Sequence, residues 1–586
     1  MLPTSFDGYF LEPEFVGAGS FVTRWQDPTW GLGWALLDSP VEIRTANAPE
    51  EIERLLQAIE ADSGSIWALS LPYEAGSWLS PQIAAKPGSF HAWAASYEPP
   101  AKFYKELAPV YAKVGVAFGE ADFDEPHFQR AFASIRTALA CGDSYQINLT
   151  HRMPFQHTGS AWDLFVSRCG VEPSPYATFI HGGDWQIASW SPELFLERHG
   201  DLLRMRPMKG TGRPNAGRLD DAKGQAENLM IVDMVRNDLG AVAESGSVRV
   251  EALFTHEQHR TVSQMTSTVT ARSKRGLTDV LKATFPPASV TGAPKVAACA
   301  IIERLELSSR GVYCGALGII EPRGDFRLSV TIRTALLRDG KGLYGVGSGI
   351  VWDSTPDAEF AEWNLKADLL RQPAPQWALV EAFPSDYLGH PEKLSPHLER
   401  MAASATELGI PFSVDQAWKL LGELRDSGLK ARLLAQRDGD LALEISPRTK
   451  RPDPMVAAIA NTPVSSKDPS LRHKTTARGL YHAHLSENAG YDEVLLFNEL
   501  GQATEFCNGA LAVRRNGQWL TPDPVQGCLP STGAAGLGAE KAVILIEELA
   551  NEREIAFVNA LSTHRIVLRV SKTSDAEPAQ APIEIP

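Results

Sequence analysis

The chain has 586 residues, of which 22% are charged, and a formal net charge of -15 at pH 7. This length exceeds what one hydrophobic core usually holds, so we expect two or more globular domains. The acidic balance argues against a nucleic-acid or anionic-membrane partner, because either would need a dominant basic surface. Six cysteines without CxxC pairing indicate reduced thiols. With no basic leader and no apolar run that could span a membrane, the sequence predicts a cytoplasmic protein.

Strand-like and helical patterns alternate through the first two thirds of the chain. Residue composition favours strands within 245–254 and 342–352, and apolar residues at helical spacing favour helices over 222–239 and 295–307. No internal repeat is visible. The pattern predicts an α+β or α/β domain.

The stretch RPMKGTGRP, residues 206–214, places Lys209 among prolines and glycines. A lone lysine in such a stretch is usually a solvated cation. It becomes a nucleophile only when its amine is uncharged, which requires burial or a neighbouring cation. The stretch by itself leaves both interpretations open.

Acidic residues occur in two of the helical segments. Glu227 precedes an apolar run, in or near the first turns of its helix, while Glu359 and Glu362 are three apart on one helix face with Lys366 four residues further on. Carboxylates brought together from distant segments would make a hard-oxygen site suited to Mg²⁺. By spacing alone, solvated surface acids are the more frequent explanation.

A change of composition divides the chain near Gln376. LRQPAPQ, at 370–376, ends a charged helical pattern and precedes the strand-like start WALVEAF. We therefore expect one domain over 1–370, a linker over 371–376 and a second domain over 377–570. The polar stretch 571–586 predicts a disordered tail.

Eight blocks follow one another in the first domain: GDSYQINLT (142–150), SPELF (191–195), RPMKGT (206–211), AENLMIVDMVRNDLG (226–240), FPPASVTGAPK (285–295), YCGALG (313–318), TIRTA (331–335) and GVGSGIVWDSTPDAEFAEWNLKA (345–367). Through them, residues 120–370 resemble the chorismate-utilising enzymes, which include anthranilate, aminodeoxychorismate, isochorismate and salicylate synthases. The resemblance implies an α+β chorismate-binding fold, a layered β-sandwich with helices and a cleft between its halves. Residues 1–119 resemble the family's weakly patterned N-terminal portion.

Within this family, Lys209 separates two groups. Anthranilate synthases have alanine at this position, whereas aminodeoxychorismate synthases have a PIKGT-like box, which PMKGT resembles. A lysine can take part in the reaction that replaces the 4-hydroxyl of chorismate by an amine at the same carbon. A covalent lysine adduct at C2 would divide the reaction into two allylic displacements. The resemblance therefore favours the nucleophile.

Gln146, in YQINL, makes a second distinction. The isochorismate and salicylate synthases have a lysine there that acts as a base on water, and glutamine cannot take that role. One departure is Gln264, in VSQMTSTV, where many relatives have histidine. A proton donor inferred from that histidine is not expected here.

Other roles are implied residue by residue through the same blocks. Glu193 would be the general acid toward the departing hydroxyl, and Arg333 would bind a carboxylate with its paired donors. The remaining implied site residues are Thr291, Gly292 and Lys366 for substrate and Glu227 with Glu362 for Mg²⁺.

The amination reaction requires a source of ammonia. No cysteine lies in a GxCxG nucleophile elbow and position 2 is leucine, so the two common glutaminase types are not encoded. We expect a separate glutamine amidotransferase subunit that delivers ammonia.

The second domain contains HLERM (397–401), RHKTTARGLYHA (472–483), YDEVLLFNELGQATE (491–505) and QWLTPDPVQGCLPST (518–532). These segments resemble the fold-type IV enzymes of pyridoxal 5'-phosphate, which include aminodeoxychorismate lyase and branched-chain aminotransferases. The resemblance implies a smaller α/β domain in which Lys474 carries the cofactor, Glu505 pairs with its ring nitrogen and Arg400 meets its phosphate. Relatives of this kind are commonly dimers, so a homodimer is one expectation.

This half departs from its family at the phosphate side. Where relatives have LPGxxR, the chain has LPSTGAA, with Ser531 for glycine and Ala534 for arginine, and Ala510 replaces an asparagine. Thr532 and free backbone amides at a helix start could bind the phosphate instead.

The two resemblances together imply a bifunctional enzyme that makes 4-amino-4-deoxychorismate and then eliminates pyruvate to give 4-aminobenzoate, for folate or a specialised pathway. Two alternatives stay open. One is an anthranilate synthase with an aminotransferase-like appendage, and the other is a synthase whose second domain is a non-catalytic docking module for the glutaminase.

Overall fold

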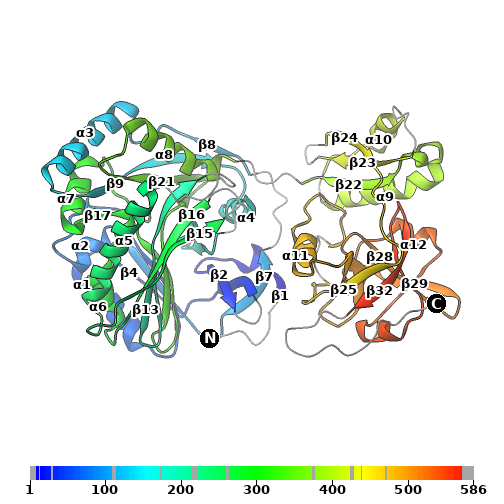
Figure 1. The fold of residues 1–586 in the computed structure, drawn as a ribbon, viewed down its shortest axis with the longest axis horizontal. Helices are drawn as coiled ribbons and strands as arrows, with labels where there is room; N and C mark the ends of the chain where they lie inside the picture. The colour runs from blue at the N-terminus through cyan, green and yellow to red at the C-terminus, as the bar shows by residue number, and fades with distance from the viewer. Residues whose placement is uncertain are drawn as a thin grey trace. The chain divides into compact units, whose positions relative to one another are not determined.

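The structure is a computed structural model, and it describes residues 8–11, 13–27, 31–107, 114–171, 174–212, 222–258, 263–372, 377–408, 410–422, 428–436, 439–466, 468 and 471–569. Most of the expected linker, the expected tail over 571–586 and the side chain of Gln264 lie outside this description. The chain forms two compact units, Met1–Pro375 (unit 1) and Gln376–Pro586 (unit 2). In Figure 1, unit 1 runs from blue to green and unit 2 from yellow-green to red. Among the described residues, no helix has the length and apolar character needed to cross a membrane.

Unit 1 contains two large sheets. The eleven-stranded sheet has the order β1-β7-β3-β2-β10-β11-β20-β21-β9-β17, with β8 paired to β9. The ten-stranded sheet has the order β14-β16-β13-β12-β19-β18-β5-β6-β4, with β15 paired to β16. Their strands are β1 (Gly8–Leu11), β2 (Phe21–Asp27), β3 (Gly31–Leu37), β4 (Glu42–Ala46), β5 (Ile66–Leu71), β6 (Ala92–Tyr97), β7 (Lys102–Leu107), β8 (Val116–Phe118), β9 (Gln146–His157), β10 (Tyr176–His181), β11 (Gln186–Ser191), β12 (Leu194–His199), β13 (Leu202–Arg206), β14 (Met208–Gly212), β15 (Arg249–Gln258), β16 (Ser263–Arg272), β17 (Gly292–Ala293), β18 (Ala316–Ile320), β19 (Phe326–Val330), β20 (Thr334–Arg338) and β21 (Lys341–Ile350).

The two sheets pack face to face, as the side chains of β5 show. Ile66 and Ala68 join a buried cluster that also contains Phe21 and Ile180 from the other sheet. Trp67 and Leu69 alternate with them and point to the opposite face, where they pack under helices. Successive side chains of a strand point to opposite faces, so a strand that is apolar throughout fits a sheet covered on both sides.

Helices cover the outer face of each sheet. The eleven-stranded sheet packs against α3, α4, α7 and α8, and the ten-stranded sheet against α1, α2, α5 and α6. The result is the layered α+β sandwich that the sequence predicts. The helices are α1 (Pro49–Ala61), α2 (Ala75–Leu79), α3 (Glu125–Cys141), α4 (Ala161–Val171), α5 (Ala222–Gly240), α6 (Leu277–Thr284), α7 (Lys295–Leu305) and α8 (Pro356–Arg371).

Unit 2 is a smaller α/β domain with two sheets. Its three-stranded sheet, β22-β23-β24, packs with α9 and α10, and its eight-stranded sheet has the order β27-β26-β25-β32-β31-β28-β29-β30. The strands are β22 (Leu379–Pro384), β23 (Leu429–Ala435), β24 (Leu441–Pro447), β25 (Met455–Ile459), β26 (Glu493–Phe497), β27 (Ala503–Phe506), β28 (Gly509–Arg515), β29 (Gln518–Pro522), β30 (Glu540–Ala542), β31 (Ile555–Val558) and β32 (Thr563–Arg569). The helices are α9 (Pro391–Glu407), α10 (Val414–Leu421), α11 (Gly479–Glu487) and α12 (Thr532–Gly536).

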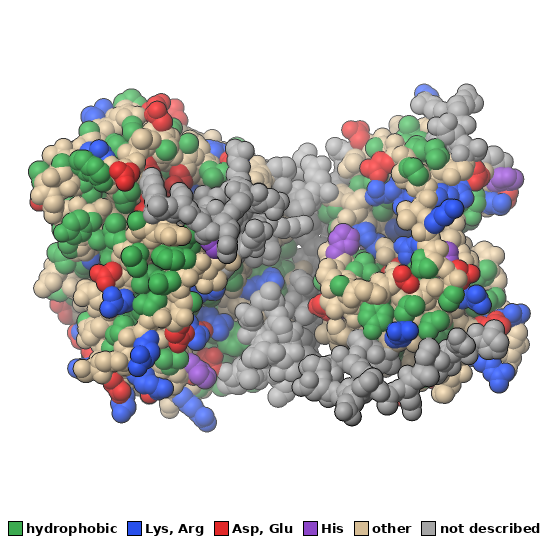
Figure 2. All heavy atoms as spheres, in the orientation of Figure 1, with side chains coloured by type: hydrophobic (Ala, Val, Ile, Leu, Met, Phe, Trp, Pro, Cys, Tyr) green, Lys and Arg blue, Asp and Glu red, His purple; other side chains and the backbone are tan. Residues whose placement is uncertain are grey.

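The face of each unit seen in Figure 2 carries interspersed acidic and basic side chains. In unit 2, Lys and Arg side chains gather between the side formed by β22 and α9 and the side formed by α11 and β28. The described part of unit 2 has a pocket with Arg400 of α9 and Tyr481 of α11 among its lining residues.

Candidate active sites

Lys209 of unit 1 reaches from one sheet to the other. It lies on β14, at the edge of the ten-stranded sheet, where it is paired with Met265. Its Nζ is 2.5 Å from the point that a Cβ on Gly349 would occupy. Gly349 belongs to β21 of the eleven-stranded sheet. The amine therefore fills space that a larger residue on β21 would take.

Gln146 faces the same glycine from a third segment. It is the first residue of β9, fully buried, and its Nε2 lies 3.2 Å from the Cβ position of Gly349. Neither its Nε2 nor its Oε1 makes a hydrogen bond within the described residues. Leaving a buried amide unpaired costs about 1–3 kcal/mol. Such a group is typical of a site that completes its hydrogen bonds with a ligand.

Glu193 provides a buried carboxyl that interacts with the same lysine. It lies between β11 and β12 and is only 4% exposed. Burial raises its pKa to about 7, against the opposing effects of a hydrogen bond from Ser289 and the charges of Lys209 and Lys366. A carboxyl with this pKa is protonated in a large fraction of molecules near neutral pH, so it can donate a proton.

Thr291 and Gly292 lie against the start of β9. Gly292 pairs with Ile147, and its φ of 158° lies at the edge of the positive-φ region. A Cβ on Gly292 would approach the carbonyl oxygen of Gln146 to 2.1 Å, so only glycine fits. The hydroxyl of Thr291 is fully buried and donates to backbone oxygens of the preceding turn.

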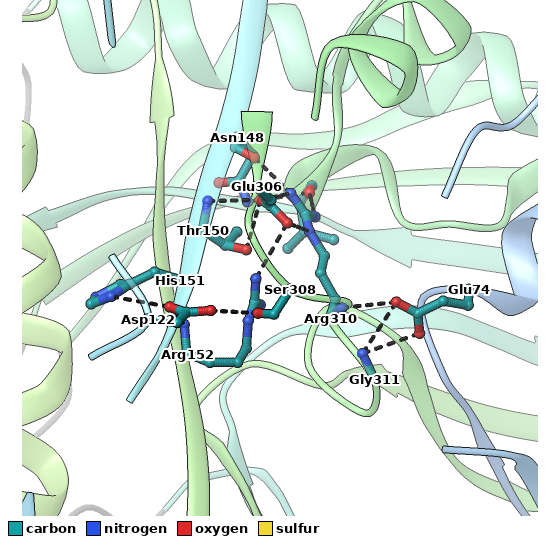
Figure 3. A network of polar contacts seen from close by, with 11 residues as sticks. Glu74, Asp122, Asn148, Thr150, His151, Arg152, Glu306, Ser308, Arg310 and Gly311 are labelled. Atoms are coloured by element: carbon teal, nitrogen blue, oxygen red, sulfur yellow. Dashed lines mark hydrogen bonds and ion pairs between the residues drawn. The ribbon is translucent and has the colours of Figure 1, made fainter. Parts of the chain in front are cut away.

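A buried ionic network fixes this region (Figure 3). Glu306 accepts hydrogen bonds from the backbone and hydroxyl of Thr150 on β9 at 2.8 and 2.7 Å, and pairs with Arg310 at 2.8 Å and Arg152 at 3.3 Å. Arg310 also donates to the carbonyl oxygens of Asn148 at 2.7 Å and Val290 at 2.6 Å. Burial alone would raise the pKa of Glu306, but Arg310 and Arg152 hold it below its usual value. The network therefore ties β9 to the turn that precedes Thr291.

Arg333 and Lys366 come from two further segments. Arg333 adopts a positive φ of 49°, and its carbonyl accepts from the backbone of Trp190. Lys366 of α8 donates to the carbonyl of Gly347 on β21 at 2.7 Å and pairs with Glu362 at 2.6 Å. Lys366 also acts electrostatically on Glu193, so α8 and β21 meet at the same site.

The predicted metal ligands lie on two helices. Glu227 is on α5 and is partly buried, and Glu362 is on α8 in its ion pair with Lys366. Glu359 is not a solvated acid, because it is 7% exposed and its Oε1 accepts from Ser354 at 2.6 Å. Over the described residues, no group of three or more His, Cys, Asp or Glu side chains could hold a metal ion. A pair of carboxylates would therefore depend on oxygen atoms of a ligand to complete the coordination of Mg²⁺.

Unit 2 has a pocket of about 620 Å³, including its open mouth. It brings together every residue of this unit that the sequence predicts for the cofactor. Its charged and polar lining residues are Arg400, His473, Lys474, Thr475, Arg478, Tyr481, Glu505, Asn508, Ser531, Thr532 and Asn559.

Lys474 has an unusually acidic amine. Burial lowers its pKa to about 8, although the charge of Glu381 opposes this, and its Nζ lies 3.9 Å from Glu381. A lysine with this pKa is uncharged in about a tenth of molecules at pH 7, far more often than a lysine with the usual pKa. Its amine can therefore react with a carbonyl group.

Arg400 is paired with Glu381, a residue that no local sequence pattern marks. Its Nε and Nη2 each lie 2.7 Å from an oxygen of Glu381, and its Nη1 donates to the carbonyl of Pro530. Burial alone would raise the pKa of Glu381, but Lys474 and Arg400 lower it to about 2. His397 also contacts this carboxylate at 2.7 Å. Arg400 is thus fixed within the pocket before any phosphate binds.

Glu505 ends a strand-turn-strand segment, as the sequence predicts, with β26 and β27 antiparallel. Its two oxygens accept from the hydroxyl of Tyr481 at 2.7 Å and the backbone N–H of Leu529 at 3.3 Å. Burial raises its pKa to about 7. A positive partner such as a protonated ring nitrogen would stabilise its ionised form.

The phosphate side departs from its family as the sequence indicates. Thr532 begins α12, and the hydroxyl of Ser531 accepts from the backbone N–H of Ala534 at 3.1 Å. Ala534 is buried at 1% exposure and Ala510 at 8%. Arg400 and Thr532 therefore remain the polar groups available for a phosphate among those the sequence predicts.

Sequence reasoning missed several residues of both sites. Nothing in the local pattern marks Glu381, Ser289 or Glu306, because their partners are distant in the sequence. Arg478 and Tyr481 lie in the same segment as Lys474, and their spacing of four and seven residues from it could have indicated them. The missed residues mostly hold or polarise the predicted ones.

Comparison with known proteins finds one family match in unit 1 and another in unit 2. A family model described as chorismate binding enzyme matches residues 98–372, and one described as Amino-transferase class IV matches residues 378–570. Aminodeoxychorismate synthase component 1 of Salmonella typhimurium is 39% identical over 254 residues, which is 41% of this chain and 56% of that protein. Anthranilate synthase component 1 of Neisseria meningitidis serogroup C is 36% identical over 259 residues, which is 42% of this chain and 53% of that protein. The chain thus spans little more than half the length of these relatives.

Among solved structures, anthranilate synthase component I from Streptococcus pneumoniae has a TM-score of 0.49 and 22% identity, covering 61% of this chain and 91% of that one. Residues 98–372 thus match the chorismate-binding enzymes and residues 378–570 the class IV aminotransferases, and one chain contains both regions.

Proposed function

We propose that this protein aminates chorismate to 4-amino-4-deoxychorismate in unit 1 and eliminates pyruvate from that product in unit 2 to give 4-aminobenzoate. The observation that carries the first half is the position of Lys209 against Gly349 and Gln146, near the raised-pKa carboxyl of Glu193. An anthranilate synthase would have no use for a lysine there. The proposed nucleophile and the proposed general acid would then act within one site.

The chemistry divides between Lys209 and Glu193. The amine of Lys209 forms a bond to C2 of the ring, the two conjugated ring double bonds shift from C1=C2 and C5=C6 to C1=C6 and C4=C5, and the C4–O bond breaks as Glu193 donates its proton to the departing hydroxyl, which leaves as water. Ammonia then forms a bond at C4, the double bonds shift back, and the C2–N bond to Lys209 breaks. Each displacement needs a free amine, so the surplus protons return to the base form of Glu193 or to solvent.

Binding of the substrate falls to the residues around this pair. Arg333 and Lys366 supply positive charge for the carboxylates of chorismate, and Gln146 offers a buried amide with unused donors and acceptor. Glu227 and Glu362 would hold Mg²⁺, which supplies charge neutralisation at a substrate carboxylate. The Glu306 network keeps Gln146, Thr291 and Gly292 in register.

The residues at the Lys474 and Glu505 end of the unit 2 pocket are suited to hold the ring of pyridoxal 5'-phosphate. Lys474 would carry the cofactor through its amine, Glu505 would pair with the ring nitrogen, and Arg400 with Thr532 would meet the phosphate. The cofactor supplies an electron sink when it is bound. Lys474, with its lowered pKa, is also suited to take the proton from C4 of the substrate and return a proton during elimination.

We propose that the ammonia comes from a separate glutamine amidotransferase, because the relatives at 39% identity are named as component 1 of an aminodeoxychorismate synthase. Excess ammonium salt should then replace the partner in an assay. This makes the chain testable by itself.

The test is incubation of the purified chain with chorismate, Mg²⁺, pyridoxal 5'-phosphate and an ammonium salt, followed by product analysis. Formation of 4-aminobenzoate supports both halves of the proposal. Accumulation of 4-amino-4-deoxychorismate alone would limit the activity to unit 1 and favour a docking role for unit 2, for which Ala510 and Ala534 are the motivating observations. Formation of anthranilate would contradict the proposal.

A further inference from the structure

Arg478 is a pocket-lining cation whose recorded polar partners are all neutral. It follows Lys474 by four residues in the sequence and lines the same pocket. Its Nη2 donates to the carbonyl of Cys507 and to Oδ1 of Asn508, the latter at 3.2 Å. Neither partner balances the positive charge of the guanidinium.

The other charges of the pocket have close partners. Arg400 is paired with Glu381 through two hydrogen bonds. Glu505 is bound by Tyr481 and by the backbone of Leu529. Lys474 is 3.9 Å from Glu381. Among the described residues, Arg478 is thus the lining cation without a carboxylate within ion-pair distance, although Glu505 of the same pocket interacts with it electrostatically.

The guanidinium of Arg478 is held in place from two sides. Its Cζ lies 4.4 Å from the ring centroid of Tyr481. On another side, Asn508 is oriented by Glu493, to which its Nδ2 donates at 3.0 and 3.3 Å, and buried Glu493 is paired with Arg451 at 3.0 Å. The chain Arg451–Glu493–Asn508 therefore presents the Asn508 oxygen to Arg478 and fixes the plane of its guanidinium.

Two donor groups of Arg478 are left for a ligand. Its Nε and Nη1 make no recorded hydrogen bond to a residue that the structure describes, while Nη2 is used. Nε and Nη1 lie on different edges of the guanidinium, so each offers one charged N–H donor to a carboxylate oxygen, and a fixed guanidinium loses less entropy on binding one. The gathering of Lys and Arg side chains on this face of unit 2 would attract an anionic substrate (Figure 2).

From this geometry we infer that Arg478 is the carboxylate-binding residue of unit 2. It holds one carboxylate of a dicarboxylate substrate while the substrate's amine reaches the end of the pocket that contains Lys474. This inference rests on the proposed function, because 4-amino-4-deoxychorismate carries one carboxylate on its ring and one on its enolpyruvyl group. It adds a specificity-determining residue that would favour anionic substrates over neutral amines.

The test compares the full-length wild type with Arg478→Gln, Arg478→Lys and the control Arg472→Gln. Arg472 is exposed and does not line the pocket. Each protein is supplied directly with 4-amino-4-deoxychorismate. We expect Arg478→Gln to raise KM by roughly 10- to 100-fold, the range for loss of a charged hydrogen-bond pair, with a smaller change in kcat. Arg478→Lys should recover part of the loss, and Arg472→Gln should behave as wild type.

A second readout separates substrate binding from cofactor binding. The visible absorbance of bound pyridoxal 5'-phosphate should be equal in wild type and Arg478→Gln. Inhibition constants are measured for 4-aminobenzoate, for pyruvate and for aniline, which lacks a carboxylate. Weaker inhibition of Arg478→Gln by 4-aminobenzoate or by pyruvate, with aniline unchanged, supports the inference and identifies which carboxylate is bound.

Loss of cofactor absorbance in Arg478→Gln would overturn the inference, since the arginine would then serve the cofactor. Unchanged KM and unchanged inhibition by both carboxylates would overturn it as well. Failure of the proposed function gives a different result, because the wild type itself would then release no 4-aminobenzoate from 4-amino-4-deoxychorismate.

Discussion

The Nζ of Lys209 lies 2.5 Å from the point where a side chain on Gly349 would begin. A residue on the edge of one sheet of unit 1 therefore depends on the absence of a side chain on a strand of the other. The amide of Gln146 lies against the same point at 3.2 Å. The proposed nucleophile and a proposed substrate-binding group are thus positioned by one glycine.

Gly349→Ala should reduce synthase activity while leaving the fold intact. The added methyl group would displace the Lys209 amine, which is the far end of a flexible side chain, so little strain would remain in the core. A displacement of about 1 Å in a reacting group can cost roughly 10²-fold in rate. Amination rate and melting temperature are measured together, with Gly17→Ala as the control, because a Cβ there would meet nothing within 4 Å. Full activity in Gly349→Ala would contradict the placement of Lys209.

Glu193 predicts a pH limit on amination. A general acid must be protonated, and burial raises the pKa of Glu193 to about 7. The rate should therefore fall as the pH rises through about 7, provided that ammonia is held constant as the free base. Glu193→Gln should lower the rate roughly 10²- to 10⁴-fold and remove this limb of the pH profile. Glu98→Gln, at an exposed position, is the control, and a limb that persists in Glu193→Gln would assign it to another group.

Glu227→Gln and Glu362→Gln should each weaken the dependence of chorismate turnover on Mg²⁺. Each substitution removes a charged oxygen ligand from a hard-cation site, so the concentration of Mg²⁺ for half-maximal rate should rise. Asp357→Asn, exposed on α8, is the control for Glu362.

The ion pair between Glu362 and Lys366 requires a separate comparison, because Glu362→Gln also releases that lysine. Lys366→Met removes the lysine and keeps the carboxylate, so the concentration of Mg²⁺ for half-maximal rate should not rise in this variant. Equal Mg²⁺ responses in wild type and both glutamate variants would mean that these carboxylates are not metal ligands.

Lys474→Ala should leave formation of 4-amino-4-deoxychorismate intact and stop its conversion to 4-aminobenzoate. The two reactions are assigned to separate units, and only the second requires the amine of Lys474. Product ratios are followed over time in the coupled assay, with the exposed Lys450→Ala as the control. Conversion at the wild-type rate in Lys474→Ala would remove the elimination from unit 2.

The sequence predicted the architecture where the signal was local or carried by ordered blocks. The helix expected over 222–239 is observed at Ala222–Gly240, and the strand expected over 342–352 at Lys341–Ile350. The first 119 residues have a weak sequence pattern, yet they supply β1 to β8 of the two sheets. The pattern is weak because strands buried on both faces lose the apolar and polar alternation that marks a strand.

The site residues divide in the same way, into those that a sequence block marks and those that only folding brings together. Lys209, Glu193, Lys474 and Glu505 are identifiable because each lies in a block that resembles a motif of a known family. The residues that tune them were not, since Ser289, Glu306 and Glu381 act through partners brought close only by folding. Arg400 was expected at a phosphate, and its pairing with Glu381 depends on the register between α9 and β22, which spacing does not reveal.

Covalent participation of Lys209 can be trapped chemically. Denaturing the enzyme during turnover with chorismate and limiting ammonia should leave a mass increase on the peptide that contains RPMKGT. The adduct should be absent from Lys209→Ala and from wild type quenched before chorismate is added. An unmodified peptide at every quench time would favour a positioning role for the lysine.

The most direct measurement is the regiochemistry of the product made by Lys209→Ala from chorismate, Mg²⁺ and ammonia. Without the covalent route, ammonia should attack C2 directly, so we expect slow formation of the 2-amino isomer or anthranilate. Arg333 and Glu193 would still bind and polarise chorismate, which keeps this residual reaction measurable. Formation of 4-amino-4-deoxychorismate by Lys209→Ala at near the wild-type rate would contradict the account.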